Sequence, residues 1–133
     1  MKDIVDTASE AGTFKTLLKA CETAGLVSTL KSPGPYTVFA PSDEAFSKLP
    51  AGTVENLLKD RRRLEAVLKY HVVPGRIDSR EVSNRNSLKT AEGQELPVDL
   101  SGGVKIGTAR VVKPDIQATN GIIHVIDSVL IPK

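Results

Sequence analysis

Hydrophobic residues recur at helical spacing through the first half of the chain. Between positions 14 and 21, four apolar residues stand at i, i+3, i+4 and i+7 and therefore share one helix face: Phe14, Leu17, Leu18 and Cys21. Thr13 can cap this helix, and Gly25 can end it. On this face, Cys21 is predicted to be a small buried hydrophobic residue rather than a reactive thiol.

Further helices are predicted up to residue 68. Ser42 or Asp43 can cap the next helix, because their side-chain oxygens can accept hydrogen bonds from the free amides of its first turn. Thr53 can cap another helix. The apolar helical spacing then returns twice, in residues 54–58 and 64–68.

After these helices, the spacing of apolar residues changes from a helical to a strand-like period. A strand is predicted from Tyr70 to Val73, and alternating apolar residues predict two strands around a turn at 101–103. Asn120-Gly121 predicts a type I′ hairpin turn, because that turn requires positive φ at both central residues. Other strands are predicted at 36–39, 109–112, 116–118 and 122–131.

Helices first and strands later predict an α+β domain, in which helices pack on a mixed or largely antiparallel sheet. The chain of 133 residues has the length of one domain, and no linker, repeat or low-complexity segment divides it. We therefore expect a single domain over residues 1–133.

Composition and charge narrow the classes of function. The net charge of +2 and the five aromatic residues, which are not interleaved with bases, predict no nucleic-acid binding. No apolar run is long enough to span a bilayer, and the first residues are acidic where an export signal would be apolar, so we expect a soluble chain without membrane insertion. Its location stays open: cytoplasmic, or extracellular or at the cell surface if an export signal has been removed. The single cysteine permits no intramolecular disulfide.

Candidate catalytic groups are present by residue type only. A serine, an acid and two histidines could supply nucleophile, orienting group and base: Ser42, Asp43, His71 and His124. The chain has no G-x-S-x-G motif, no H-E-x-x-H zinc motif and no calcium or phosphate loop. We therefore predict no catalytic residue, no metal site and no cofactor.

Two segments resemble the signature boxes of the fasciclin domain family: YTVFAPSDEAFSKLP at 36–50 and NGIIHVIDSVLIP at 120–132. Between them, Tyr70-His71 matches the tyrosine-histidine pair of the family, so the resemblance covers nearly the whole chain. It implies a wedge of two roughly orthogonal β-sheets with a cluster of helices from the N-terminal half. It also implies adhesion to a cell-surface or matrix protein or glycan.

The resemblance also suggests where a partner binds. Pro114, Asp115 and Ile116 match a segment linked to integrin binding in animal members, whereas Lys113 and Gln117 differ from it. Because Lys113 reverses a charge, integrin is a doubtful partner. We expect this segment to lie at a sheet margin, from which Asp115 projects to solvent.

The Tyr70-His71 pair is predicted to be structural, with the tyrosine in the core and the histidine ring hydrogen-bonded to an acid. By resemblance, Asp43 is that acid. The same pair has been implicated in integrin recognition in animal members, but a buried side chain cannot contact a receptor unless the domain opens.

The leading hypothesis is a monomeric, non-enzymatic binding module for cell-surface or matrix contact. Two alternatives remain open: an intracellular structural or stress-related protein with the same fold, and a small hydrolase. The lack of an export signal and the unpaired Cys21 point to the first alternative. Esterase or glycosidase turnover that is lost in His71→Ala would support the second.

Overall fold

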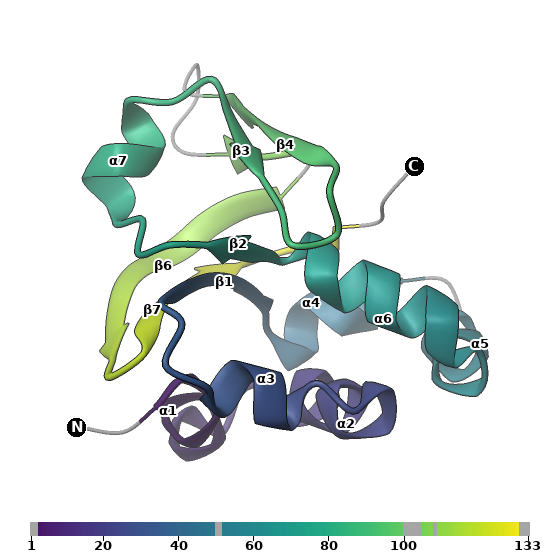
Figure 1. Ribbon diagram of the computed structural model, residues 1–133. Helices are drawn as coiled ribbons and strands as arrows, with labels where there is room; N and C mark the ends of the chain where they lie inside the picture. The colour runs from purple at the N-terminus through teal and green to yellow at the C-terminus, as the bar shows by residue number, and fades with distance from the viewer. Residues whose placement is uncertain (1–2, 50–51, 100–104, 108, 131–133) are drawn as a thin grey trace.

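The structure, a computed structural model, describes residues 3–49, 52–99, 105–107 and 109–130 (Figure 1). The helices are α1 (Ile4–Ala11), α2 (Lys15–Ala24), α3 (Val27–Lys31), α4 (Asp43–Ser47), α5 (Thr53–Lys59), α6 (Arg61–Tyr70) and α7 (Ser79–Ser83). The strands are β1 (Tyr36–Pro41), β2 (Val72–Pro74), β3 (Ser87–Lys89), β4 (Glu95–Asp99), β5 (Lys105–Ile106), β6 (Ala109–Ala118) and β7 (Gly121–Ile126). The α+β class is confirmed, because helices pack on a seven-stranded mixed sheet.

The strands follow the order β2-β1-β7-β6-β5-β4-β3. β1 runs parallel to β7, and the other neighbouring pairs are antiparallel. The two ends of this order also meet, since the amide of Ala91, just after β3, donates to the carbonyl oxygen of Val72 in β2 over 2.7 Å. The two sheets implied by the family resemblance are joined here through the long, curved strand β6 (Figure 1). The turn predicted at 101–103 lies outside the described residues.

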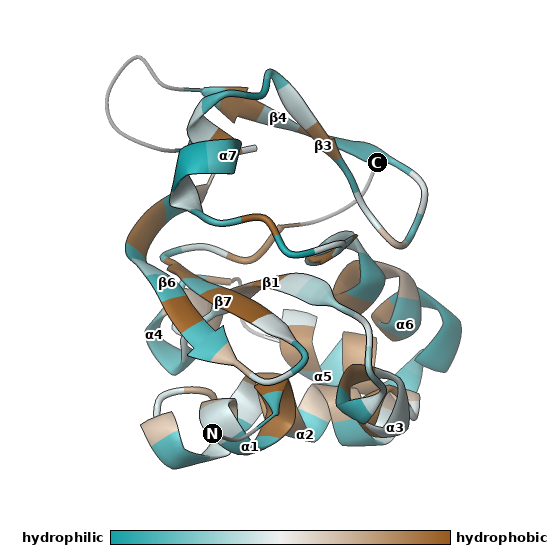
Figure 2. Ribbon diagram, turned by 60° about the vertical axis from the view of Figure 1, so that its left-hand side comes forward, coloured by the Kyte–Doolittle hydropathy of each residue, from teal (hydrophilic) through white to brown (hydrophobic). Residues whose placement is uncertain are grey.

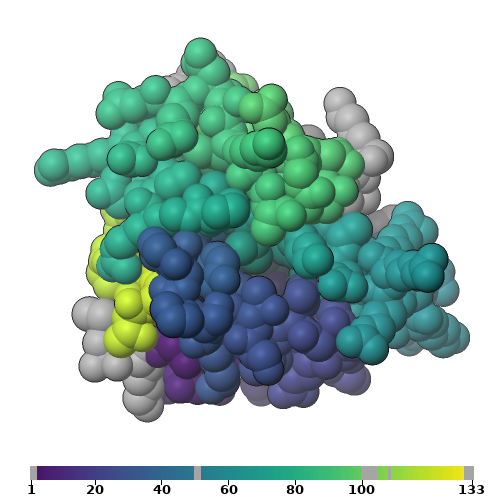
Figure 3. Space-filling model, in the orientation of Figure 1, coloured from purple at the N-terminus to yellow at the C-terminus, as the bar shows by residue number. Residues whose placement is uncertain are grey.

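Strand alternation gives each face of the central strands its own core. In β1, Val38 and Ala40 belong to the core under the N-terminal helices, whereas Phe39 belongs to the core under α7 and the β3–β4 hairpin. Hydrophobic segments of β1, β6 and β7 lie between these two layers (Figure 2). On one face of the molecule, α7 and the β3–β4 hairpin form the upper part and the N-terminal helices the lower part (Figure 3).

The α6 helix extends further than the sequence pattern predicted. Tyr70 is its last residue and His71 its C-cap, so the start predicted for the next strand was wrong: β2 begins at Val72, not at Tyr70. The amide of His71 donates to the carbonyl oxygen of Leu68 over 3.0 Å and completes the last turn. The β propensity of this segment therefore yields to the packing of the helix.

The β6–β7 hairpin is confirmed, but the predicted turn is wrong. Ala118 pairs with Gly121, so Thr119 and Asn120 form a two-residue loop. Within the described residues, Asp115 is the non-glycine residue with positive φ. Asn120 therefore does not adopt the conformation that a type I′ turn requires.

Asn120 and Gly121 instead hold the hairpin against the rest of the fold. The Asn120 side chain is buried, accepts the amide of Ile4 over 2.9 Å and donates to the carbonyl oxygen of Leu30. A Cβ atom at Gly121 would lie 1.9 Å from the carbonyl oxygen of Tyr36. A glycine is therefore needed where β7 approaches β1.

Candidate functional site

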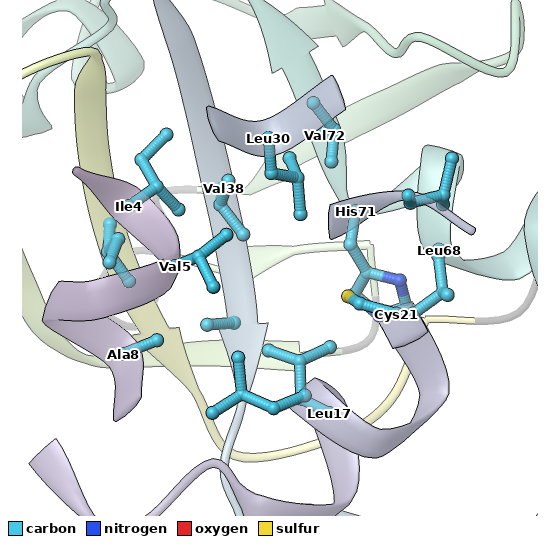
Figure 4. A pocket seen from close by; sticks show the side chains of 14 residues that line it. Ile4, Val5, Ala8, Leu17, Cys21, Leu30, Val38, Leu68, His71 and Val72 are labelled. Atoms are coloured by element: carbon cyan, nitrogen blue, oxygen red, sulfur yellow. The ribbon is translucent and has the colours of Figure 1, made fainter. Parts of the chain in front are cut away.

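A small apolar cavity of about 30 Å³ lies between the N-terminal helices and the sheet, and both Cys21 and His71 line it (Figure 4). The other lining side chains are aliphatic, and they include Ile4 of α1 and Val38 of β1. Cys21 is 4% exposed, and burial, followed by the charge of Glu22, raises the pKa of its thiol to about 12. The prediction that Cys21 is buried is therefore confirmed.

His71 is buried, and both of its ring nitrogens are engaged. Its Nδ1 donates to the carbonyl oxygen of Val67 over 2.7 Å, and its Nε2 accepts the amide of Leu130 over 2.8 Å. The acceptor role of Nε2 places the proton on Nδ1 of a neutral ring. Burial lowers the pKa of His71 to about 4, and the bond to Val67 offsets only part of this effect. His71 therefore ties the end of α6 to the segment after β7.

Asp43 is not the hydrogen-bond partner of His71, so this expectation from the family resemblance was wrong. The carboxylate of Asp43 accepts the amide of Thr16 over 2.8 Å and that of Lys15 over 3.4 Å, both in the first turn of α2. These amides have no acceptor within the helix and carry the positive end of its dipole. The carboxylate of Asp43 therefore accepts these amides, whereas His71 is hydrogen-bonded to backbone groups of Val67 and Leu130.

Asp43 thus takes the place of a local cap for α2. The N-cap residue of α2 is Phe14, whose side chain makes no capping bond, so the cap predicted at Thr13 was wrong. The carbonyl oxygen of Thr13 instead accepts the amide of Asp43 over 2.8 Å. Ser42 caps α4 as predicted, because its hydroxyl accepts the amide of Ala45. The first signature box therefore links two helix starts.

Tyr70 lies in the core beneath α7 and the β3–β4 hairpin. It is 7% exposed and belongs to the same cluster as Phe39 and Leu88. Burial raises the pKa of its phenol, and the charge of Glu92 acts in the same direction. Since Tyr70 and His71 are both buried, neither side chain offers a surface to a partner of the folded domain.

The candidate binding segment is an irregular and exposed part of β6. Its pairing with β7 shifts register between Val111 and Lys113 and again between Lys113 and Ile116. Residues 112–115 are exposed between these points. Asp115 has a φ of 60°, a conformation that costs a residue with a side chain about 1 kcal/mol. Bulges of this kind redirect side chains and often lie beside functional sites.

Asp115 uses its carboxylate within the fold. One oxygen accepts the amide of Ser79 over 2.9 Å, and the other accepts its hydroxyl over 2.6 Å. The bond from the Ser79 hydroxyl is the main cause of a lowered pKa of Asp115. The residue is exposed, as expected, but its carboxylate is hydrogen-bonded to Ser79 and holds the start of α7.

Ser79, Asp115 and His124 lie together but do not form a catalytic triad. The amide of Asp115 donates to Nδ1 of His124 over 3.1 Å, and Nε2 donates to the carbonyl oxygen of Ile77 over 2.8 Å. The imidazole also stacks on Phe39, with ring centroids 5.5 Å apart. A serine nucleophile needs a ring nitrogen as its base, but the Ser79 hydroxyl donates to a carboxylate. The three residues fasten α7 to the sheet.

A pocket of about 100 Å³ opens between α7 and the bulged part of β6. Its lining residues are Phe39, Ser79, Val82, Val111, Pro114 and His124. The sequence interpretation missed Ser79 and Val82 because it did not predict α7. Asp78 followed by Glu81 was the available signal, since an N-cap acid with a glutamate three residues later is typical of a helix start. The Asp78 side chain does accept the amide of Glu81 over 3.0 Å.

Two further observations concern the described residues alone. Across residues 3–49, 52–99, 105–107 and 109–130, no three His, Cys, Asp or Glu residues are grouped so that they could hold a metal ion. None of the helices in these ranges is long and apolar enough to cross a membrane.

The fold and this site define a small α+β domain that presents a bulged strand and a pocket on its surface. A family model described as "Fasciclin domain" matches residues 12–132, and the chain therefore belongs to the fasciclin domain family. The resemblance of the two sequence boxes is confirmed.

The relatives range from bacterial to animal proteins. "Uncharacterized protein sll1735" of Synechocystis sp. is 43% identical, and the match covers 98% of each chain. "Transforming growth factor-beta-induced protein ig-h3" of Sus scrofa is 38% identical, and the match covers 99% of this chain but 20% of that protein. The solved FAS1 domain pair of the insect cell adhesion molecule Fasciclin I has a TM-score of 0.80, covering 98% of this chain and 51% of that chain. Its 18% identity supports the fold alone.

Proposed function

We propose that this fasciclin domain is a non-enzymatic adhesion module that contacts a protein or glycan of the cell surface or extracellular matrix. The observation that carries the proposal is the exposed, bulged segment of β6 beside a pocket. Membership of the fasciclin domain family, for which the sequence resemblance implies adhesion, supports the same class. In this proposal the chain acts as a monomer of one domain, residues 1–133, outside the cell or at its surface.

The bulged segment is the part of the sheet best placed to meet a partner. In the described pairing, residues 111–118 have one strand neighbour, β7, because β5 pairs only with Ala109 and Arg110. Elsewhere the terminal strands β2 and β3 are linked through Ala91 and Val72. An exposed backbone segment with an adjoining pocket suits recognition of an extended partner.

Side chains in this segment divide into contact and positioning residues. Val112 is an apolar side chain that is 56% exposed, and Pro114 lines the pocket. Lys113 is exposed and forms no ion pair within the described residues. We assign the contact to these three residues. Asp115 holds α7, and Ile116 packs on the core, so both keep the contact surface in place.

The charges around the pocket favour a partner with acidic groups. The acids next to it already have donors: Asp115 binds Ser79, and Glu81 pairs with Arg85 over 3.2 Å. The cation of Lys113 is left to attract an acidic partner, such as an anionic glycan or an acidic loop. The positive charge of Lys113 also supports a partner other than integrin.

Adhesion of protein-coated beads tests this proposal. The beads are applied to the surface of cells that produce the protein and to arrays of matrix proteins and glycans. We expect Val112→Ser/Lys113→Glu to lose at least about tenfold in bead retention, since it removes apolar contact and reverses a charge. Lys89→Glu, an exposed lysine on β3, is the matched control and should adhere as the wild type does. Equal retention of the folded double variant would refute the assigned contact.

A further inference from the structure

A second hollow, larger than the β6 pocket, is lined by residues of α2, α4 and α5. These helices lie away from α7 and β6 (Figure 1). We define the α2–α4–α5 groove by Lys15, Lys19, Phe46, Val54, Glu55 and Leu58. It is an open surface groove of about 520 Å³, a volume within the range of sites that bind small molecules or peptide side chains. Phe46 belongs to the first signature box, whereas the residues of α2 and α5 lie outside both boxes, and the proposed adhesive contact does not involve this surface.

The floor of the groove is apolar and incompletely covered. Phe46 and Leu58 are half-buried and rest on the main core, and Val54 is half-buried outside it. Apolar side chains that remain partly exposed in one hollow gain free energy when a partner covers them.

The rim of the groove carries charges that the fold leaves unpaired. Lys15 and Lys19 are exposed, stand four residues apart on α2, and form no ion pair within the described residues. Asp43, an acid that also lines this hollow, has its carboxylate on the first amides of α2. Glu55 stands on α5, across the groove, and is also without an ion pair in the described part of the chain.

We propose that the α2–α4–α5 groove binds an amphipathic helix of a partner protein, with its apolar face on the floor and two carboxylates one turn apart beside Lys15 and Lys19. Residues four apart on a helix lie about 6 Å apart along its axis, so acids at i and i+4 match the lysine pair. A base on the other flank of the partner helix faces Glu55.

An extended strand is a poorer occupant than a helix. The walls of the groove are helices, which present no row of free backbone groups for strand pairing, and the first amides of α2 donate to Asp43. Affinity must come from side-chain burial and charge, which is the mode of helix-in-groove recognition.

A designed peptide tests the proposal without knowledge of the natural partner. The probe is a fluorescent helix of about 18 residues, with leucines on one face, glutamates at i and i+4 on one flank and lysines on the other. We expect a Kd on the order of 100 µM or tighter by fluorescence anisotropy with the full chain, weakening as salt is raised. A peptide of the same composition with a scrambled order should not bind.

Charge reversal identifies the site and the occupant. The double substitution Lys15→Glu/Lys19→Glu should weaken binding of the glutamate peptide by about tenfold. The same variant should bind a peptide that carries lysines in place of the glutamate pair. The control, Arg62→Glu/Lys89→Glu, makes the same charge change outside the groove and should bind as the wild type does. Absence of peptide binding, equal binding by both double variants, or equal binding of the scrambled peptide would overturn the proposal. Binding of dodecanoate that displaces the peptide at equal affinity would assign the groove to a fatty acid instead.

Discussion

Cys21 and His71 show at the scale of the residue how burial removes chemistry that the sequence seems to offer. Both side chains line one apolar cavity. Burial raises the pKa of Cys21 and lowers the pKa of His71, and each shift favours the neutral side chain. The helical spacing of Cys21 predicted its burial. The partners of His71 could not be predicted, because a backbone carbonyl four residues back and an amide 59 residues away leave no pattern in sequence.

Native Cys21 should resist thiol reagents. A pKa of about 12 leaves almost no thiolate at neutral pH, and the side chain is 4% exposed. We expect labelling by a disulfide reagent to be slow in buffer and rapid in denaturing urea, measured by absorbance. Labelling at the same rate in both conditions would contradict the packing of α2.

His71 should make stability depend on pH below neutrality. Its pKa is lowered from 6.5 to about 4 in the folded state, so between these values the unfolded chain binds a proton that the folded chain does not. Protonation therefore favours unfolding as the pH falls from 6.5 to 4, by up to about 3 kcal/mol. Above 6.5 the effect is absent.

Urea denaturation at several pH values measures this dependence. His71→Gln should be less stable than the wild type at pH 7, since bonds to Val67 and Leu130 are disturbed, by about 1 to 3 kcal/mol. Its unfolding free energy should also fall less steeply with acid. A variant with the wild-type slope would show that another group causes the pH dependence.

At the scale of the element, local patterns predicted most helices and the β6–β7 hairpin, but not how elements begin. Periodicity reports which face of a helix is buried, so it identified α2 and α6. The cap of α2 comes from Asp43, outside that helix, and the start of α7 is held by Asp115 from β6. Contacts between distant elements depend on the fold and cannot be predicted from spacing.

Asp43→Ala should destabilise the domain by about 1 kcal/mol, because the first turn of α2 loses its acceptor. Asp43→Asn keeps an oxygen acceptor and should therefore lose less stability than Asp43→Ala. Glu44→Ala, an exposed neighbour, serves as the control and should stay within about 0.5 kcal/mol. Equal midpoints of urea unfolding for Asp43→Ala and the control would show that the cap contributes nothing.

Asp115→Ala should loosen α7 more than it changes the rest of the fold. The substitution removes both acceptors of Ser79, and we expect a loss of about 1 kcal/mol with faster hydrogen exchange in residues 79–83. Lys113→Ala, on the same strand, is the control and should leave exchange unchanged. Unchanged exchange in Asp115→Ala would argue that α7 is held by apolar contacts alone.

For the whole molecule, the order of elements predicted the α+β class, but the sequence could not show how the strands connect. A continuous strand order whose ends meet through Ala91 and Val72 depends on pairings between segments far apart in the chain. Among the described residues, the part of β6 from Val111 to Ala118 pairs with a strand on one side only. The whole fold thus buries Tyr70 and His71 and exposes residues 112–115.

The central claim is that adhesion depends on this exposed segment and not on the buried tyrosine-histidine pair. The direct measurement is bead adhesion by Tyr70→Phe, which keeps the ring in the core, and by Val112→Ser/Lys113→Glu, after circular dichroism shows that each variant is folded. We predict wild-type adhesion for Tyr70→Phe and a loss for the double variant. A folded Tyr70→Phe protein that fails to adhere, beside a double variant that adheres normally, would contradict the account.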